Sequence, residues 1–273
     1  MVALPIIIIS LVQGFTEFLP ISSQGHNILI AKYFNFTSVE LRQMNIIVHF
    51  GSLIAIIIYN YRVIIRIFFS IKHFFRPDLD NHSLLLRSII ISTLPLFLSG
   101  YITASYLNQN FFESLKVIGI TSIIFSILLY FIDTNCLTIK SIIRLDEKTA
   151  FIIGCFQSLA VIPGASRSGV VITGMRMLGF NRFDSQSYSN ILAIPAILGA
   201  VFYSINNLES KGFQSFESIN FESLALFFLS FIFSFIFIHF VLSWVRKRTF
   251  KIFVIYRILF GCFVLLHFYN IFN

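Results

Sequence analysis

Residues Gln13–His26 read QGFTEFLPISSQGH and interrupt an apolar N-terminal region. Within fourteen positions they place a carboxylate, an imidazole, two adjacent serines, two glycines and a proline. Ionisable groups are costly inside a lipid bilayer and are retained there for function. A second polar stretch, Pro163–Ser168 (PGASRS), also follows a short apolar run. We expect the two stretches to face each other and to form one site.

The composition places the chain in a membrane. Of its 273 residues, 57% are hydrophobic and 12% are charged, and the mean hydropathy is +0.86. Soluble domains carry about 25% charged residues. The net charge of +8 is best assigned to cytoplasmic loops, so no nucleic-acid partner is expected. The three cysteines are scattered and show neither metal-ligand spacing nor a disulfide framework.

The hydrophobic runs predict an all-α integral membrane protein with about six transmembrane helices and two re-entrant helix pairs. The predicted spans are 45–61, 84–106, 117–132, 187–205, 223–245 and 252–269. The runs beside the two polar stretches are shorter than the roughly 20 residues that a span needs. These half-helices are predicted at 3–12, 26–34, 149–162 and 170–178. Irregular backbone at membrane depth is tolerated only where it lines a cavity or is buried in protein.

The order of these segments predicts an inverted repeat within a single polytopic domain, 1–273. Two half-helices and three spans occur in repeat 1 (about 1–133) and again in repeat 2 (about 149–270). Because three spans are an odd number, the second repeat enters from the opposite face. The Lys/Arg-rich loops then fall on one side, which should be cytoplasmic. They are 62–82, 133–148 and 246–251.

Helical spacing brings the polar groups of the first stretch together. Gln13 and Glu17 are four residues apart, and Ser23 and His26 are three apart, so each pair shares a helix face. The two faces can converge across the Pro20 turn. Two other interpretations stay open at this point. Glu17 could be a protonated carboxyl bonded to carbonyls freed by the proline, and His26 could be a buried structural histidine.

Arg167 in the second stretch predicts an anion site. A guanidinium in an apolar hairpin needs an anion, and its fork matches phosphate oxygens. Helices that begin after Ser22 and after Ser166 would both direct their positive ends into one cavity. Ser168 and the tight turn at Gly164 lie beside the arginine. The alternative is an ion pair between Arg167 and Glu17 that holds the repeats together and could open to admit a substrate.

These motifs resemble those of the undecaprenyl-diphosphate phosphatase family, also called the bacitracin-resistance protein family. The family patterns are roughly (E/Q)-x-x-x-E followed by P-x-S-S-x-G-H, and P-G-x-S-R-S-x-x-T. The segments HFGSLIA (49–55) and LAIPA (192–196) are similar too, and the resemblance covers essentially the whole chain. This sequence has Gln13 where many members have Glu, and Val171 where the second motif ends in Thr. Thr173 is a poor substitute, so one hydroxyl contact to phosphate should be missing.

The resemblance implies a bacterial inner-membrane, multi-pass hydrolase with two interleaved inverted repeats. Such enzymes convert undecaprenyl diphosphate to undecaprenyl phosphate and inorganic phosphate, which recycles the lipid carrier for peptidoglycan and confers bacitracin resistance. The active site would open to the periplasm and use a divalent cation, Mg²⁺ or Ca²⁺. The expected partners are a polyprenyl diphosphate lipid and the membrane, and a homodimer is left open.

The resemblance also implies residue roles. Arg167 and amides near Ser166 and Ser168 would hold phosphate oxygens, and Glu17, with or without Gln13, would hold the metal or act as acid and base. Ser23 is the candidate nucleophile with His26 as its base; attack by His26 or by a metal-activated water is the alternative. The expected substrate-binding residues are Ser22, Gly164, Ser166 and Ser168. A different function, lipid-phosphate transport or flipping through the same anion site, also suits inverted repeats.

Overall fold

The chain folds into helices around a buried polar centre. The computed structural model describes residues 4–75, 80–106, 111, 114–138, 140, 145–210 and 221–269, and this part contains no β-strand. Six of its helices are long and apolar enough to cross a membrane. They are α3 (Ser38–Tyr59), α5 (Asn81–Tyr106), α7 (Leu115–Asn135), α10 (Arg182–Ser210), α11 (Phe221–Val245) and α12 (Lys251–Phe268). The predicted all-α, multi-pass membrane protein is confirmed.

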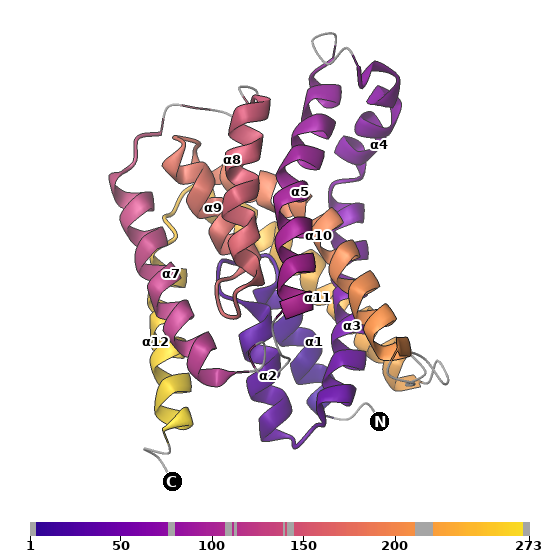
Figure 1. The fold of residues 1–273 in the computed structure, drawn as a ribbon, viewed down its shortest axis with the longest axis vertical. Coiled ribbons are helices and arrows are strands. Elements are labelled where there is room, and N and C mark those ends of the chain that lie inside the picture. The colour runs from indigo at the N-terminus through magenta and orange to yellow at the C-terminus, as the bar shows by residue number, and fades with distance from the viewer. Residues whose placement is uncertain are drawn as a thin grey trace.

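Two pairs of shorter helices lie where the polar stretches interrupt the apolar sequence. The first pair is α1 (Leu4–Thr16) and α2 (Ser23–Tyr33); the second is α8 (Glu147–Ser158), continued by the 3₁₀ turn η4 (Leu159–Val161), and α9 (Arg167–Met177). The pairs come from opposite ends of the molecule, and the turns within them approach each other near its middle (Figure 1). Their re-entrant position in a membrane stays a prediction.

The main difference from the predicted elements lies in the loop at 62–82. It contains helix α4 (Tyr61–Ser70) and the 3₁₀ turn η1 (Ile71–His73). Arg62 and Arg66 are four residues apart and share one face of α4, whereas its other residues are mostly apolar. Residues 76–79, 107–110, 112–113, 141–144 and 211–220 of the predicted loops lie outside the described residues.

Helix α3 begins seven residues before its predicted start at 45, because a capping box defines its N-terminus. The Thr37 hydroxyl accepts from the Glu40 amide at 3.2 Å, and the Glu40 carboxylate accepts from the Thr37 amide at 2.8 Å. At the start of α8, the Asp146 carboxylate accepts from Thr149, which lowers the pKa of Asp146 below its ordinary value.

Helices from the two halves of the sequence pack against one another. Helix α1 packs along α11, and α8 packs along α5; α3 meets α10, and α7 meets α12. In two of these helix pairs, a glycine allows the two backbones to approach closely. A Cβ at Gly14 would lie 2.7 Å from the Ser234 nitrogen, and one at Gly154 would lie 2.8 Å from the Ser92 carbonyl oxygen. Each of these pairs joins a helix of predicted repeat 1 to a helix of predicted repeat 2; the repeats and their interleaving stay a prediction.

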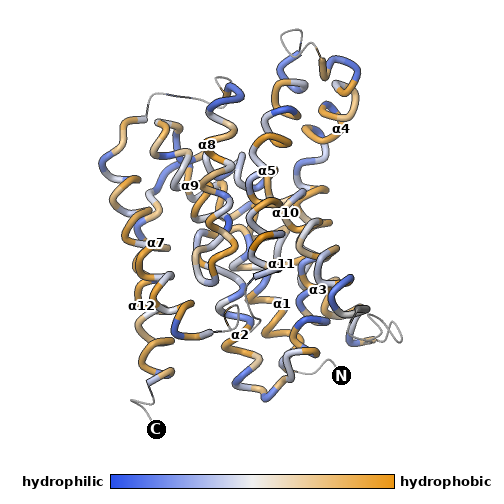
Figure 2. Tube along the Cα trace, in the orientation of Figure 1, coloured by the Kyte–Doolittle hydropathy of each residue, from blue (hydrophilic) through white to orange (hydrophobic). Residues whose placement is uncertain are grey.

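The surface of the long helices is apolar. Figure 2 shows hydrophobic residues along most of their length and hydrophilic residues concentrated towards their ends. Large side chains such as Leu94, Leu98 and Phe131 are more than half exposed. A lipid environment accepts such a surface, whereas water would not favour so extensive an apolar area.

Candidate active site

The two polar turns have nearly the same backbone conformation. Ser22, which precedes α2, has φ 68° and ψ 91°, and Ser166, which precedes α9, has φ 67° and ψ 111°. A glycine follows three residues after each serine, at Gly25 and Gly169. The left-handed region is strained for residues with a side chain, and such strain is retained mainly at functional sites. The match agrees with the expectation that the two turns belong to one site.

Glu17 is the centre of the polar cluster. Its Oε2 accepts from Gln13 Nε2 at 3.0 Å and from the Ser23 hydroxyl at 2.9 Å. Its Oε1 accepts from Arg167 Nη2 at 3.2 Å. His49 Nε2, from α3, lies 3.5 Å from Oε2. The predicted convergence of the two stretches is thus seen in the structure, and the side chain of Glu17 is only 8% exposed.

Arg167 joins three parts of the fold. Besides Glu17 in the first turn, it donates through Nη1 to the Ser189 carbonyl on α10 at 2.7 Å. Its side chain is 13% exposed. The ion pair with Glu17 that the sequence left as an alternative therefore exists. Such a pair need not be permanent, because a second anion can replace the carboxylate at the guanidinium.

The serines of the second turn bind protein groups. The Ser168 hydroxyl donates to the Leu19 carbonyl at 2.6 Å and so ties the second turn to the first. Ser166 accepts from the Gly169 amide at 3.2 Å, which caps α9. The carbonyl of Gly164 accepts from Arg257 at 2.6 Å. In this state these three residues hold the turns in place; their predicted contacts to a substrate stay a prediction.

Sequence reasoning missed Arg257 on α12. Its guanidinium donates to the carbonyls of Pro20 at 3.2 Å, Gly164 at 2.6 Å and Ala165 at 2.5 Å, so it clamps both turns at once. The residue is 1% exposed and pairs with no carboxylate in the described part of the chain. The sequence contained an indication of this role. Arg257 is the single arginine in the apolar run 252–269, and an ionisable residue in such a run is expected to be functional, as is Arg167.

His26 is held apart from Ser23. Its Nδ1 lies 2.8 Å from the Ser22 carbonyl oxygen, and its Nε2 lies 2.8 Å from the Tyr256 hydroxyl on α12. Ser23 instead donates to Glu17. The structure therefore brings both predicted residues to the first turn but does not join them by a hydrogen bond, and the acceptor beside the Ser23 hydroxyl is the Glu17 carboxylate.

The donor set suits a divalent cation only if the substrate supplies part of the coordination. Asn27 donates to Gln13 Oε1 at 3.0 Å, so Gln13 turns its amide nitrogen towards Glu17. Glu17 is then the one carboxylate of the cluster, and the described residues contain no group of three His, Cys, Asp or Glu that could hold a metal. Mg²⁺ commonly binds one or two carboxylates together with substrate phosphates. A cation carried by a diphosphate therefore fits.

Val171 occupies an apolar environment. It is fully buried in a cluster with Ile153, Met175 and Tyr188. Thr173, two residues later, donates to the Gly169 carbonyl of its own helix at 2.7 Å. The valine therefore offers no hydroxyl, and the Thr173 hydroxyl is bonded within α9.

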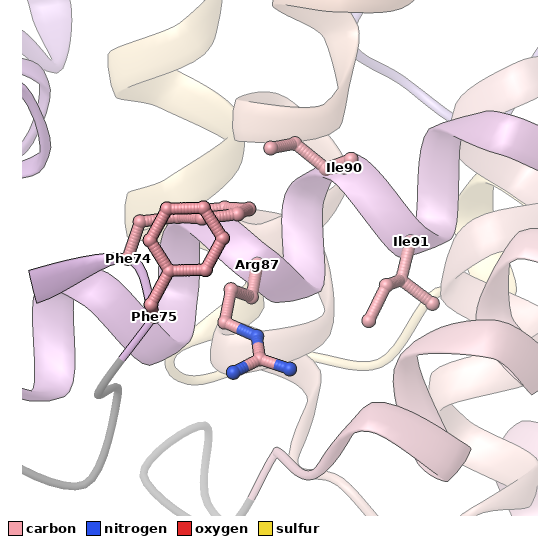
Figure 3. A pocket seen from close by; sticks show the side chains of 5 residues that line it. All are labelled: Phe74, Phe75, Arg87, Ile90 and Ile91. Atoms are coloured by element: carbon pink, nitrogen blue, oxygen red, sulfur yellow. The ribbon is translucent and has the colours of Figure 1, made fainter. Parts of the chain in front are cut away.

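Two cavities lie away from the cluster. One, of about 420 Å³, is formed by Phe74, Phe75, Arg87, Ile90 and Ile91 (Figure 3). Arg87 also pairs with Glu147. The other, of about 480 Å³, includes Tyr59, His239 and Arg246. No residue of the Glu17 cluster lines either cavity.

Comparison with known proteins agrees with the geometry. Residues 6–263 match the family described as bacitracin resistance protein BacA. A protein of Pelagibacter ubique named undecaprenyl-diphosphatase is 41% identical over 266 residues, which cover 97% of each chain. One of Alteromonas mediterranea with the same name is 35% identical over 264 residues, 95% of this chain and 96% of the relative. With its two signature turns joined at Glu17 and matched over nearly its whole length, the chain belongs to the bacitracin resistance protein BacA family.

Proposed function

We propose that the protein hydrolyses undecaprenyl diphosphate to undecaprenyl phosphate and inorganic phosphate. The observation that carries this proposal is the Ser23 hydroxyl, 2.9 Å from the Glu17 carboxylate and within one cluster with Arg167. An anion carrier needs the arginine, whereas hydrolysis also needs a nucleophile with a base. The names of the relatives support the same reaction. Recycling of the lipid carrier and bacitracin resistance would follow from it.

Charge favours a diphosphate at this place. Two guanidinium groups lie at the two turns: Arg167 pairs with Glu17, and Arg257 is buried against backbone carbonyls. With Glu17 as the one carboxylate there, the turns carry an excess of positive charge. The terminal phosphate would replace Glu17 as the partner of Arg167 Nη2 and release the carboxylate. Such fixed donors commonly provide the largest contribution to catalysis, and removal of one costs about 10²–10³ in rate.

The reaction then proceeds through Ser23. Glu17 takes the proton of the hydroxyl as its oxygen attacks the terminal phosphorus. The bond between that phosphorus and the bridging oxygen breaks, and undecaprenyl phosphate leaves with the electron pair. Undecaprenyl phosphate takes the proton from Glu17 as it leaves, and the freed carboxylate then deprotonates the water that cleaves the phosphoserine. Glu17 returns that proton to the Ser23 oxygen as inorganic phosphate is released. Direct attack by His26 requires its Nε2, which the Tyr256 hydroxyl occupies in the structure.

A divalent cation, Mg²⁺ or Ca²⁺, would enter with the diphosphate, and Glu17 would be its protein ligand. When bound, the cation would neutralise part of the negative charge of the phosphates. Gln13 takes part as the amide that donates to Glu17. The Lys/Arg distribution supports a cytoplasmic position of the loops at 62–82, 133–148 and 246–251. Insertion in the bacterial inner membrane, with the site open to the periplasm, is inferred from the resemblance to the family. The expected lipid partner would bind at this cluster, and a homodimer stays a prediction.

The test is product analysis with detergent-purified protein and undecaprenyl diphosphate in Mg²⁺. Phosphorus NMR should show equal amounts of inorganic phosphate and undecaprenyl phosphate, and EDTA should abolish both. Intact diphosphate after prolonged incubation with well-folded protein would contradict the proposal. If the same protein then moved the lipid across the bilayer of a vesicle, transport would take its place.

A further inference from the structure

Helix α12 reaches the candidate site with a side chain that no motif includes. Tyr256 directs its hydroxyl at His26 Nε2, 2.8 Å away, and its neighbour Arg257 clamps both turns. Tyr256 is 40% exposed, whereas His26 is 7% exposed. The tyrosine thus connects the outer side of α12 with a buried imidazole of the first turn.

The contacts of His26 define which atom carries its proton. The Ser22 carbonyl oxygen can only accept, so Nδ1, 2.8 Å away, carries the hydrogen. In the neutral imidazole Nε2 is then an acceptor, and the Tyr256 hydroxyl is the donor. Both nitrogens are satisfied, and no part of the ring is available to take the proton of Ser23.

Aromatic neighbours fix the plane of the imidazole. Phe260 stacks on it with a centroid distance of 3.9 Å and an interplanar angle of 10°. The Tyr256 ring is nearly parallel, at 8°, with its centroid 5.7 Å away. Stacking on Phe260 restricts the tilt of the ring, and the two hydrogen bonds restrict its rotation.

The hydrogen bonds form a chain that ends beside Ser23. It runs from the Tyr256 hydroxyl to His26 and from His26 to the Ser22 carbonyl. Ser22 is the residue with φ 68°, a conformation that persists only where its surroundings stabilise it. The next residue is Ser23, whose hydroxyl must stay aligned with Glu17.

We propose that Tyr256 is a positioning residue: through His26 it holds the Ser22 turn in its left-handed conformation and keeps Ser23 aimed at the phosphate. His26 is then required for the shape of the turn and for the placement of Ser23. The kinetic part of this inference rests on the proposed phosphatase activity; the hydrogen-bond chain does not.

The decisive variant is Tyr256→Phe, which keeps the ring and removes the hydroxyl. A small misplacement of reacting groups can cost about 10² in rate, so we expect kcat to fall roughly tenfold to a hundredfold. KM should change less than threefold, since the substrate contacts are not touched. The matched control is Tyr59→Phe, which removes a hydroxyl 3.3 Å from another histidine, His239, away from the cluster.

A spectroscopic measurement tests the chain independently of activity. In ¹⁵N-histidine-labelled protein, the His26 resonances are assigned by comparison with His26→Asn. Tyr256→Phe should move the Nε2 resonance of His26 towards that of a non-bonded imidazole nitrogen, and Tyr59→Phe should not. Thermal unfolding confirms that each variant is folded.

The possible results distinguish a failure of the positioning role from a failure of the proposed function. Wild-type kcat in Tyr256→Phe would overturn the proposal, and so would a lower kcat with unchanged His26 resonances. A shifted resonance in a protein whose wild type releases no phosphate would instead contradict the proposed function and leave the hydrogen-bond chain in place.

Discussion

The Ser23 hydroxyl donates to Glu17 Oε2 over 2.9 Å. The same oxygen accepts from Gln13, and the other carboxylate oxygen accepts from Arg167. Serine is a weak nucleophile until a base is positioned to take its proton. In the proposed mechanism Glu17 is that base, and His26, which has no hydrogen bond to Ser23, has a different role.

Replacement of Ser23 by alanine should abolish phosphate release, with a fall of at least a hundredfold, because the attacking oxygen is lost. Ser168→Ala is the informative comparison. Its hydroxyl donates to the buried Leu19 carbonyl, so its loss should cost about 1–3 kcal/mol of stability. Phosphate-release assays and thermal unfolding in detergent would separate the two effects. Equal activity of Ser23→Ala and wild type would rule out Ser23 as the nucleophile.

The variant Glu17→Gln should lose activity and stability together. An amide of the same shape is a poor base, and it leaves Arg167 buried without its anion. Breaking a buried pair typically costs about 3–5 kcal/mol. Glu222→Gln, at an exposed position near the start of α11, should change neither activity nor melting temperature. A stable, active Glu17→Gln protein would disprove the base assignment.

Loss of the clamp at Arg257 should disorder both turns. Arg257→Met keeps much of the side-chain volume but leaves three carbonyls, those of Pro20, Gly164 and Ala165, without this donor. We expect a lower melting temperature and at least a tenfold fall in phosphate release, since the turns carry the reacting groups. Arg248→Met removes the same charge from an exposed position and serves as the control. Equal behaviour of the two variants would argue against a clamp.

Gly164 should not tolerate a side chain. Its φ is 85°, and a Cβ there would overlap the Thr121 hydroxyl and the Ile118 carbonyl. Strain and overlap together predict a loss of at least about 2 kcal/mol for Gly164→Ala. Gly100, within α5, has no atom within 4 Å of an added Cβ, so Gly100→Ala should stabilise by about 0.4–1 kcal/mol. Thermal unfolding of the two variants under one set of conditions checks the contrast; a Gly164→Ala protein as stable as wild type would contradict it.

Long apolar runs and short-range spacing were enough to predict most of the fold. Length and hydropathy located all six long helices, and the four-residue spacing of Gln13 and Glu17 predicted that they share a helix face, on which they are hydrogen-bonded in the structure. Helix starts were less accurate, because the capping box at Thr37 extends α3 before its apolar run begins. Helix α4 was taken for part of a loop because Arg62 and Arg66 assigned the segment to the Lys/Arg-rich connection at 62–82.

The site was predictable where the motif residues are close in sequence or chemically unusual. Arg167 and Glu17 were matched as opposite charges in apolar surroundings, although 150 residues separate them. Tyr256 could not be found in this way, because a tyrosine in a membrane helix is not unusual and its partner His26 is 230 residues distant. The Ser23–His26 pairing expected from their spacing is absent from the structure because each side chain has a partner on a different segment, Glu17 and Tyr256.

The central claim is that two turns, joined through Glu17 and Arg167, form one phosphate site. The most direct test is the rate of inorganic phosphate release from undecaprenyl diphosphate in Mg²⁺ by wild type and by Arg167→Gln, each shown to be folded. We expect release by wild type and a loss of at least about 10² in the variant, since a donor to the phosphate is removed. Release by Arg167→Gln at the wild-type rate would contradict it.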